Sequence, residues 1–284
     1  MKNILITGAN GQLGNEFRNV LPYALFTGHN DLDITDAKAV NKFVKSHDIG
    51  TVVNCAAFTA TEQAEDNYDA AYDVNVLGPK NLAKTGCKII HISTDYVFDG
   101  RASLPYTPMS IPNPLSVYGA TKLGGEKALL ANAKNCIVIR ASWLYSVYGK
   151  NFVKTMRNLG ANKQEISVVN DQYGLPTYAT DLACAIAQII PQMKKDNSGV
   201  YHFSNIGIGA EKLDGITWYD FAVEIMKLSN LNCVVRPVDS AQYPTRVRRP
   251  KYSVMDTSKI QNVFGIKIPT WKDALGRCIK NLER

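Results

Sequence analysis

The chain has 284 residues, of which 45% are hydrophobic, and a formal net charge of +7. This length and composition can bury a full core and suit one large α/β unit with a smaller lobe. No apolar run is long enough for a signal peptide or a membrane span, so we expect neither. The cysteines, which form no CxxC pair, predict a reduced, cytoplasmic protein; they are residues 55, 87, 136, 184, 233 and 278.

Short apolar runs alternate with helical patterns through the first half of the chain, which is typical of a doubly wound parallel sheet. The predicted strands are residues 4–7, 24–27, 52–54, 88–93 and 137–140. The predicted helices are residues 13–21, 37–47, 70–85 and 119–133. Asp36 is a candidate cap for the second helix. Four prolines between Pro105 and Pro114 predict a loop before the last of these helices.

After residue 141 the elements become shorter and turn residues more frequent. We therefore predict an α/β, Rossmann-type doubly wound parallel sheet with a smaller α/β substrate lobe. The dinucleotide-binding domain would comprise residues 1–145 and 175–197. The substrate-binding lobe would comprise residues 146–174 and 198–284.

The excess positive charge is concentrated in residues 244–284, which contain ten Lys or Arg and three acids, while the rest of the chain has 22 of each sign. Apolar residues such as Phe264 and Trp271 alternate with these charges, which is typical of a folded segment rather than of a basic tail. We therefore do not expect nucleic-acid binding. The densest group could bind the diphosphate of a small ligand or form a solvated basic face; it comprises Arg246, Arg248, Arg249 and Lys251.

Three glycines follow the first predicted strand at regular spacing, Gly8, Gly11 and Gly14. A strand, a glycine-rich turn and a helix in this order are typical of a dinucleotide-binding unit. The helix N-terminus would offer unpaired N–H groups to a pyrophosphate. An ordinary strand-to-helix turn is the alternative, but the position directly after a buried-type strand favours nucleotide binding.

Tyr118 and Lys122 are separated by four residues, which places both side chains on one face of a helix. Of the fourteen tyrosines, only Tyr118 has a lysine at this spacing. A free phenol has a pKa of about 10, and an adjacent cation would lower it toward a working range for proton transfer. The pair therefore predicts a catalytic acid, whereas the alternative is a packed ring beside a solvated amine.

Polar and small residues gather where the predicted strands end, which is where ligands bind in such sheets. The segment 54–59 (NCAAFT) could lie against a cofactor, and Thr94 and Asp95 could contact a substrate carbonyl. Residues 31–36 could contact an adenine ring. Each segment could instead be ordinary packing or a capped turn. The four histidines show no ligand spacing, so we expect no zinc site, and His91 reads as a packed strand residue.

Motifs along nearly the whole chain resemble the extended short-chain dehydrogenases/reductases and, more narrowly, the dTDP-4-dehydrorhamnose reductase family. The specific ones are ISTDYVFDG, NDQYGLPT and RRPKYSVMDT; GxxGQLG and YGATK are shared more widely. The resemblance implies NADPH- or NADH-dependent reduction of the C4 keto group of dTDP-4-dehydro-L-rhamnose in nucleotide-sugar and polysaccharide biosynthesis, with a dTDP-sugar as the small-molecule substrate.

The resemblance also implies residue roles. Tyr118 would donate the proton, Lys122 would lower its pKa and hold the nicotinamide ribose, and Thr94 would orient the carbonyl. The substrate would contact Thr94, Asp95, Trp143 and Arg249. The cofactor would contact Gly8, Gly11, Gln12, Leu13, Gly14, Asp33, Ile34, Ala56, Ala57, Phe58, Thr59, Tyr118 and Lys122.

The cofactor preference, the metal and the oligomeric state are less defined. Residues 27–30 (TGHN) carry no acid to bind a ribose 2′-hydroxyl, which favours NADPH or dual use over strict NADH. Some relatives form a dimer around Mg²⁺, and Glu16 and Asp181 could match its ligands, so a monomer or a homodimer is expected.

Two other functions stay open at this point. One is a nucleotide-sugar epimerase or dehydratase of the same fold. The other is a non-catalytic protein resembling the regulatory subunit of methionine adenosyltransferase. The presence of Thr94, Tyr118 and Lys122 together favours a reductase over a binding subunit.

Overall fold

Six parallel strands form the central sheet of the computed structural model, which describes residues 2–242 and 245–283. The strands, in spatial order, are β10 (Gly199–Phe203), β5 (Cys136–Ala141), β4 (Lys88–Thr94), β3 (Ile49–Asn54), β1 (Asn3–Thr7) and β2 (Leu25–Thr27). Since β2 and β3 lie on opposite sides of β1, the chain changes direction across the sheet there. The crevice for a ligand is therefore expected beyond the carboxyl ends of β1 and β3.

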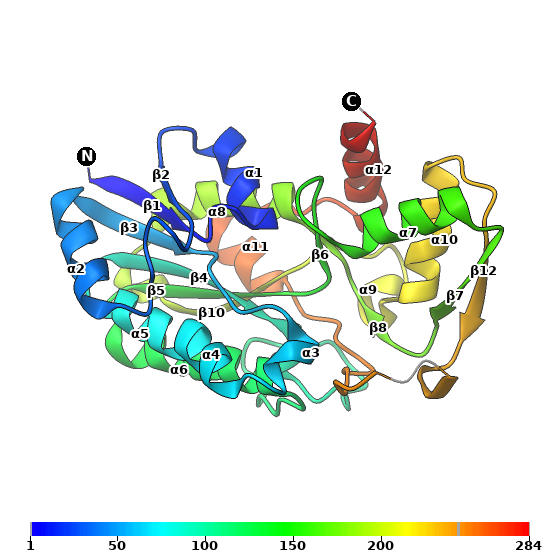
Figure 1. Ribbon diagram of the computed structural model, residues 1–284, viewed down its shortest axis with the longest axis horizontal. Coiled ribbons are helices and arrows are strands. Elements are labelled where there is room, and N and C mark those ends of the chain that lie inside the picture. The colour runs from blue at the N-terminus through cyan, green and yellow to red at the C-terminus, as the bar shows by residue number, and fades with distance from the viewer. Residues whose placement is uncertain (1, 243–244, 284) are drawn as a thin grey trace.

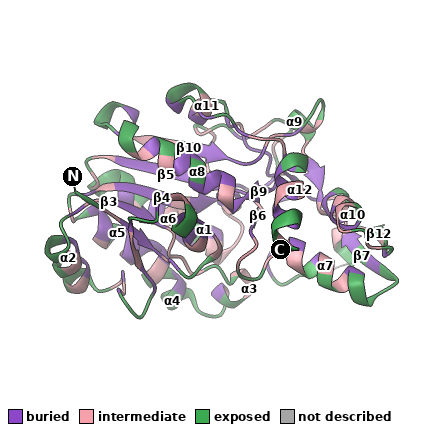
Figure 2. Ribbon diagram, turned by 90° about the horizontal axis from the view of Figure 1, so that it is seen from above, coloured by how far each residue is buried: buried purple, intermediate pink, exposed green. Residues whose placement is uncertain are grey.

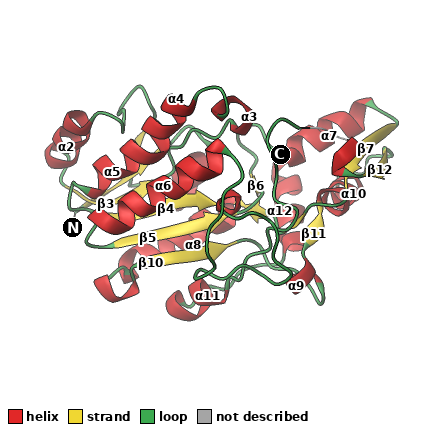
Figure 3. Cartoon of the chain, turned by 90° about the horizontal axis from the view of Figure 1, so that it is seen from below, coloured by secondary structure: helices red, strands yellow, loops and turns green. Residues whose placement is uncertain are grey.

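Helices cover both faces of this sheet (Figures 1 and 3). One face packs on α1 (Gln12–Val20), α8 (Ala179–Ile189) and α11 (Ser258–Phe264). The other packs on α2 (Ala37–Ser46), α5 (Gly78–Ala83) and α6 (Val117–Asn132). Two short helices, α3 (Thr61–Ala64) and α4 (Tyr68–Tyr72), precede α5.

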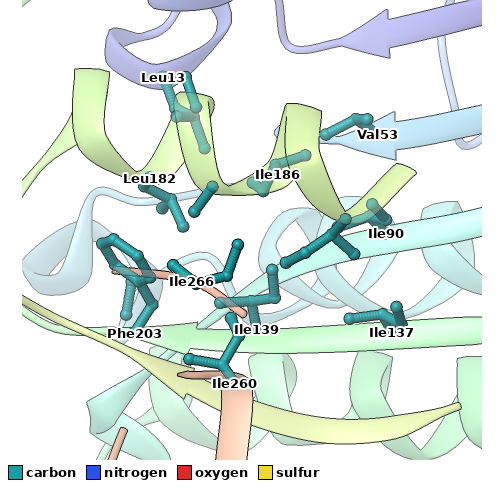
Figure 4. Packing of buried hydrophobic residues seen from close by; sticks show 14 of the residues in the cluster. Leu13, Val53, Ile90, Ile137, Ile139, Leu182, Ile186, Phe203, Ile260 and Ile266 are labelled. Carbon is teal, nitrogen blue, oxygen red and sulfur yellow. The ribbon is translucent and has the colours of Figure 1, made fainter. Parts of the chain in front are cut away.

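Consecutive strand residues point to opposite faces, because side chains alternate along a strand. Ile6, Val53 and Ile90 belong to the first core, shown in Figure 4, while their neighbours Leu5, Val52 and Ile89 belong to the second. The strands are covered on both faces and therefore largely apolar, and Figure 2 shows the sheet mostly in the colour of buried residues. The predicted α/β doubly wound fold is confirmed.

The second lobe has its own core and three small sheets. β6 (Leu144–Tyr145) pairs with β9 (Thr177–Tyr178), β7 (Glu165–Val169) with β12 (Val234–Val238), and β8 (Tyr173–Gly174) with β11 (Ile216–Thr217). The helices of this lobe are α7 (Phe152–Asn162), α9 (Glu211–Asp214), α10 (Trp218–Leu228) and α12 (Trp271–Leu282). Figure 1 shows this lobe beside the carboxyl edge of the central sheet.

The predicted strands and helices all occur, with ends that differ by a few residues. Asp36 caps α2 by accepting hydrogen bonds from the backbone N–H groups of Lys38 and Ala39. The helix predicted for residues 70–85 is interrupted by a π-helical turn at Asp73–Leu77. Strand β10 and helix α11 lie in the segment expected for the lobe, yet β10 pairs with β5 to complete the central sheet and α11 packs on a face of that sheet. The rest of the predicted division into two domains stays a prediction.

Within residues 2–242 and 245–283, no helix combines the length and apolar character that a membrane crossing requires.

Candidate active site

The glycine-rich turn after β1 provides an open helix N-terminus. Gly8 has a φ of 65°, and a Cβ there would lie 2.5 Å from the backbone nitrogen of Ala56, so only glycine fits. Gly11 is the N-cap of α1 and no side chain caps that end. The first N–H groups of the helix are therefore available to an anion. The buried Oε1 atom of Gln12 has no hydrogen-bond partner in the described part of the chain.

The segment after β3 is held beside this turn by two asparagines. Asn54 Oδ1 accepts hydrogen bonds from Thr7 Oγ1 at 2.6 Å and from the Ala56 N–H at 3.2 Å. The side-chain amide of Asn75 accepts a hydrogen bond from the Phe58 N–H and donates one to the Phe58 carbonyl. Its Nδ2 also donates to Thr121 Oγ1. Asn75 thereby fixes the backbone of residues 54–59 against α6.

The sequence interpretation missed Asn75, which lies in the π-helical turn. Such turns often occur at functional sites, but their local sequence looks helical. The signal that could have found it is an asparagine at a buried position of an otherwise apolar helix face.

Tyr118 lies in the first turn of α6, close to the end of β4. The helix begins after Ser116, whose Oγ accepts a hydrogen bond from the Gly119 N–H at 3.1 Å. The ring of Tyr118 contacts that of Tyr96 edge to face at 5.5 Å. Burial raises the pKa of the phenol, and its interaction with the Thr94 hydroxyl acts in the opposite direction. Tyr118 and Thr94, predicted from separate motifs, are brought together.

Asp95 is buried beside Thr94. Its Oδ1 accepts a hydrogen bond from Thr94 Oγ1 at 3.1 Å. Burial raises the pKa of this carboxyl from 3.8 to about 6, and hydrogen bonds from Ser253 and Thr94 oppose the rise. The pair places an exchangeable hydroxyl and a carboxyl at the end of the strand.

Lys122 is one helical turn after Tyr118, and its side chain is buried. Its Nζ donates a 2.7 Å hydrogen bond to the Ile92 carbonyl and lies 3.5 Å from His91 Nε2. Burial lowers the pKa of this amine from 10.5 to about 8, while Glu126 favours the charged form. His91 also contacts Asn54 Nδ2 through Nδ1 at 3.0 Å, so it is a packed strand residue as predicted.

The expected lowering of the Tyr118 pKa by Lys122 is wrong for this structure. Burial raises the pKa of the phenol, and Lys122 is not among the groups that affect it. The Lys122 amine instead donates a hydrogen bond to the Ile92 carbonyl. Tyr118 is therefore protonated near neutrality, which is the form that a proton donor requires.

A buried ion pair supports α6 on its strand side. Arg140 makes two hydrogen bonds to Glu126, at 2.9 and 2.7 Å, and Ser93 Oγ donates to the same carboxylate at 2.5 Å. Glu126 continues the Tyr118–Lys122 face by one more turn. The pair and its hydroxyl thus fix the register of the helix against β4 and β5.

Trp143 follows β5 with a φ of 48°, which is unusual for a bulky residue. Its indole stacks on that of Trp218 with centroids 3.6 Å apart. A Cβ on Gly174 would lie 2.7 Å from Trp143 Cε2, so the ring rests on glycine backbone. Since β5 pairs with β4 in a register that opposes Ala141 to Thr94, the tryptophan stands at the same edge as the reacting groups.

The basic segment has its four cations in different environments. Arg246 forms an ion pair with Asp66, and Lys251 Nζ lies 3.7 Å from Asp171. Arg248 is exposed. Arg249 is half-buried, its Nε is buried without a hydrogen-bond partner in the described residues, and its charge acts on the Tyr96 phenol. A cavity of about 380 Å³ adjoins this segment, with Asp99, Gly100, Arg101, Leu115, Gln172, Ser240, Ala241 and residues 245–249 and 251 in its wall.

The residues expected at the adenine are placed differently from one another. Ile34 is buried in the core with its side chain against Gly78, so only its backbone can meet a ligand. Asp33 Oδ1 accepts hydrogen bonds from Thr35. The carboxylate of Asp31 reaches back to the end of β2, where its Oδ2 accepts a 2.8 Å hydrogen bond from the Gly28 N–H. An acid therefore lies where the sequence interpretation found none.

The magnesium hypothesis receives no support from the geometry. Both carboxylate oxygens of Asp181 bind Arg277, each at 2.8 Å, and Asn205 donates to Oδ2. Glu16 Oε1 accepts a hydrogen bond from Ser146. In the described ranges, no group of three or more His, Cys, Asp or Glu side chains is arranged to hold a metal ion.

Comparison with known proteins decides the family. The family model described as the RmlD substrate binding domain matches residues 1–284. The chain belongs to this family. The expected assignment to the dTDP-4-dehydrorhamnose reductases, an oxidoreductase family, is confirmed.

Three relatives illustrate the similarity. The dTDP-4-dehydrorhamnose reductase of Aggregatibacter actinomycetemcomitans is 38% identical, over 97% of each chain. The crystal structure of a dTDP-4-dehydrorhamnose reductase from Clostridium acetobutylicum is 42% identical with a TM-score of 0.93, and all of both chains is covered. That of Bacillus anthracis, in complex with NADP, is 36% identical with a TM-score of 0.90 and covers 99% of this chain and 100% of its own.

A dinucleotide, the cofactor implied by the family, fits the residues present. The uncapped end of α1 offers backbone N–H donors to a pyrophosphate, and the glycine turn beside Ala56 lets the backbone approach it closely.

Proposed function

We propose that this chain is an NAD(P)H-dependent oxidoreductase that reduces the C4 keto group of dTDP-4-dehydro-L-rhamnose to give dTDP-L-rhamnose. The observation that carries the proposal is the convergence of Tyr118, Thr94 and Asp95 at the carboxyl edge of the sheet, between the glycine turn and the basic segment. A ketone reduction needs one proton donor, a carbonyl-orienting hydroxyl and a hydride source, and these residues supply the first two.

The bound dihydronicotinamide would supply the hydride to C4. Thr94 Oγ1 would donate a hydrogen bond to the C4 oxygen and hold the carbonyl in place. Tyr118, which burial keeps protonated, would transfer its proton to that oxygen as negative charge develops there. The hydride and the proton together convert the carbonyl into a hydroxyl, so the step balances without another reactant.

Lys122 would act on the cofactor. With a pKa of about 8, its amine is mainly charged at neutral pH and would donate a hydrogen bond to the nicotinamide ribose. Asn75 and the Asn54 amide would hold residues 54–59 in place along the cofactor. These residues position the reactants, whereas Tyr118 and Thr94 touch the reacting oxygen.

The substrate would be held from the second lobe. A dTDP-sugar carries a diphosphate, which requires cations when it leaves water. Arg249 of the basic segment has a buried Nε donor without a hydrogen-bond partner in the described residues. Its charge acts to lower the pKa of Tyr96, whose ring contacts that of Tyr118. Trp143, stacked on Trp218, would cover the sugar.

We also infer a cytoplasmic enzyme that works as a monomer or a homodimer. The cysteines at 55, 87, 136, 184, 233 and 278 are free thiols, which suits a reducing compartment where nucleotide sugars are made.

The test is to incubate the protein with the dTDP-4-keto-6-deoxyhexose and NADPH or NADH, and to follow cofactor absorbance and the sugar product. The expected result is one cofactor oxidised for each 4-hydroxy sugar formed. Isomerised sugar without cofactor oxidation would indicate an epimerase, and cofactor binding without turnover would indicate a binding subunit. Either result would overturn the proposal.

A further inference from the structure

A short acidic stretch, residues 61–66 (TEQAED), contains α3 and is attached to the start of α6. Glu65 Oε1 accepts a hydrogen bond from the Val117 N–H at 2.9 Å. Val117 is the first residue of α6 and directly precedes Tyr118. The acidic stretch is therefore fixed at the helix end that carries the proposed proton donor.

The other two acids of this stretch bind the basic segment, residues 246–251. Glu62 Oε2 accepts a 3.2 Å hydrogen bond from the N–H of Val247, whose side chain is buried. Each carboxylate oxygen of Asp66 accepts a hydrogen bond from a different guanidinium nitrogen of Arg246. These partners are 185 and 180 residues apart in the sequence. Figure 1 shows α3 beside the orange segment that returns from the second lobe to the sheet.

The far end of the basic segment is held as well. Gly100 has a φ of 74°, and a Cβ there would lie 2.5 Å from the backbone nitrogen of Lys251. The Lys251 carbonyl accepts a 2.7 Å hydrogen bond from the Tyr173 N–H. Arg249 lies between the two anchored ends. Its charge and that of Glu62 both act on the Tyr96 phenol, so the anchored segment lies close to the reacting groups.

The two arginines of this segment are in opposite situations. The hydrogen bond from Arg246 is the largest cause of the lowered pKa of Asp66, and the charges of Glu62 and Glu65 also act on Arg246. A guanidinium surrounded by acids is a poor partner for a diphosphate. Arg249, in contrast, has a buried Nε without a hydrogen-bond partner in the described residues. Arg246 thus suits an anchor and Arg249 a ligand contact.

We propose that Asp66 and Glu62 are positioning residues for the sugar nucleotide, because they hold the basic segment where Arg249 can reach the diphosphate. The inference rests on the proposed function, which places the sugar nucleotide at this segment. Neither acid touches the reacting oxygen or the cofactor. Their loss should therefore weaken substrate binding and leave kcat and the cofactor Kd unchanged.

The experiment is a double-mutant cycle of Asp66→Asn, Arg246→Gln and the double variant. Calorimetry with dTDP gives a Kd that does not depend on turnover, and steady-state kinetics give KM and kcat. Each single variant should weaken dTDP binding and raise KM about fivefold, the upper end for an exposed ion pair. The double variant should lose no more than either single one, because both substitutions remove the same contact.

Asp69→Asn is the matched control. It removes an exposed acid three residues further on, in the first turn of α4, and should leave the dTDP Kd and the KM as in the wild type.

A direct contact between Arg246 and the diphosphate would give a different result. Arg246→Gln would then weaken dTDP binding, while Asp66→Asn would leave it unchanged or tighten it. That result would overturn the inference, as would additive losses in the double variant, a parallel loss of kcat or cofactor binding, or a wild type that does not bind dTDP. A wild type that binds dTDP and shows the expected cycle, but oxidises no cofactor, would overturn the proposed reduction and leave the anchoring role intact.

Discussion

The central sheet and the second lobe differ in how their contacts are distributed along the chain. In the sheet, β1, β3, β4 and β5 are added in sequence order, and the glycine turn, the segment 54–59 and the Thr94–Asp95 pair each lie at or directly after the end of a strand. In the lobe, β7 pairs with β12 from a segment 69 residues later, by register of Glu165 with Val234, and β8 pairs with β11 in the same long-range manner. The sheet thus grows mainly by successive strand–helix units, whereas β7 and β8 of the lobe pair with strands that come after α8 and β10.

This difference separates the two tasks of the site. Thr94, Asp95 and Lys122 are buried, and burial shifts the pKa values of Asp95 and Lys122. The residues of the lobe, including Arg249, are partly exposed and carried by loops. We therefore propose that the sheet region holds the reacting groups rigidly and that the lobe makes the contacts that recognise the substrate.

The largest effect is expected from the centre of the sheet region. Tyr118→Phe keeps the ring and removes the proton donor, so kcat should fall at least about a hundredfold while the cofactor Kd changes little. Steady-state kinetics and a binding titration measure the two quantities. Tyr68→Phe, at an exposed ring, should retain the wild-type kcat. A Tyr118→Phe variant with most of its activity would remove this residue from the mechanism.

The buried carboxyl of Asp95 gives a pH dependence of known sign. Because its pKa rises from 3.8 to about 6 on folding, the folded protein holds a proton that the unfolded chain releases in this range. As the pH rises from 4 to 6, the free energy of unfolding of the wild type relative to that of Asp95→Asn should therefore fall by about 3 kcal/mol in total. Above pH 6 this difference should stay constant. Urea unfolding at several pH values measures this difference.

Asp99 provides a control of opposite sign. The hydrogen bond from Asn113 is the largest cause of its lowered pKa, so the wild type should lose stability relative to Asp99→Asn as the pH falls. A pH-independent difference for Asp95→Asn would show that its carboxyl is not buried as described.

A smaller effect, confined to the substrate, is expected from the lobe. Arg249→Ala should raise the KM for the sugar nucleotide ten- to a hundredfold, since a charged hydrogen bond is worth about 1.5–3 kcal/mol. The cofactor Kd should stay nearly unchanged. Lys267→Ala removes an exposed cation of the same C-terminal region and should leave both constants as they are. An equal loss of cofactor binding in Arg249→Ala would break the separation of the two regions.

The contrast between the regions also explains what could be predicted. Short apolar runs and the glycine turn are local signals, so the strands from Asn3 to Ala141 and the position of Tyr118 could be predicted from the sequence. The segment Gly199–Phe203 is too short to reveal that it pairs with β5 rather than with the lobe. That choice depends on packing against residues distant in the sequence, such as Ile260.

Side-chain direction was the least predictable part of the site. The spacing of Tyr118 and Lys122 predicted that both lie on one face of α6. It could not predict that the Lys122 amine donates a hydrogen bond to the Ile92 carbonyl. Similarly, the turn after β2 hides that Asp31 returns to Gly28. Both depend on hydrogen bonds to backbone groups, which leave no pattern in the sequence.

The central claim is that the sheet holds the cofactor and the lobe holds the sugar nucleotide. Hydrogen–deuterium exchange of the wild type with cofactor alone, and then with dTDP added, tests it most directly. Cofactor alone should protect the glycine turn at residues 8–14 and the segment 54–59, and dTDP should add protection at residues 245–251. Protection of residues 245–251 by the cofactor alone, with the glycine turn unaffected, would contradict the account.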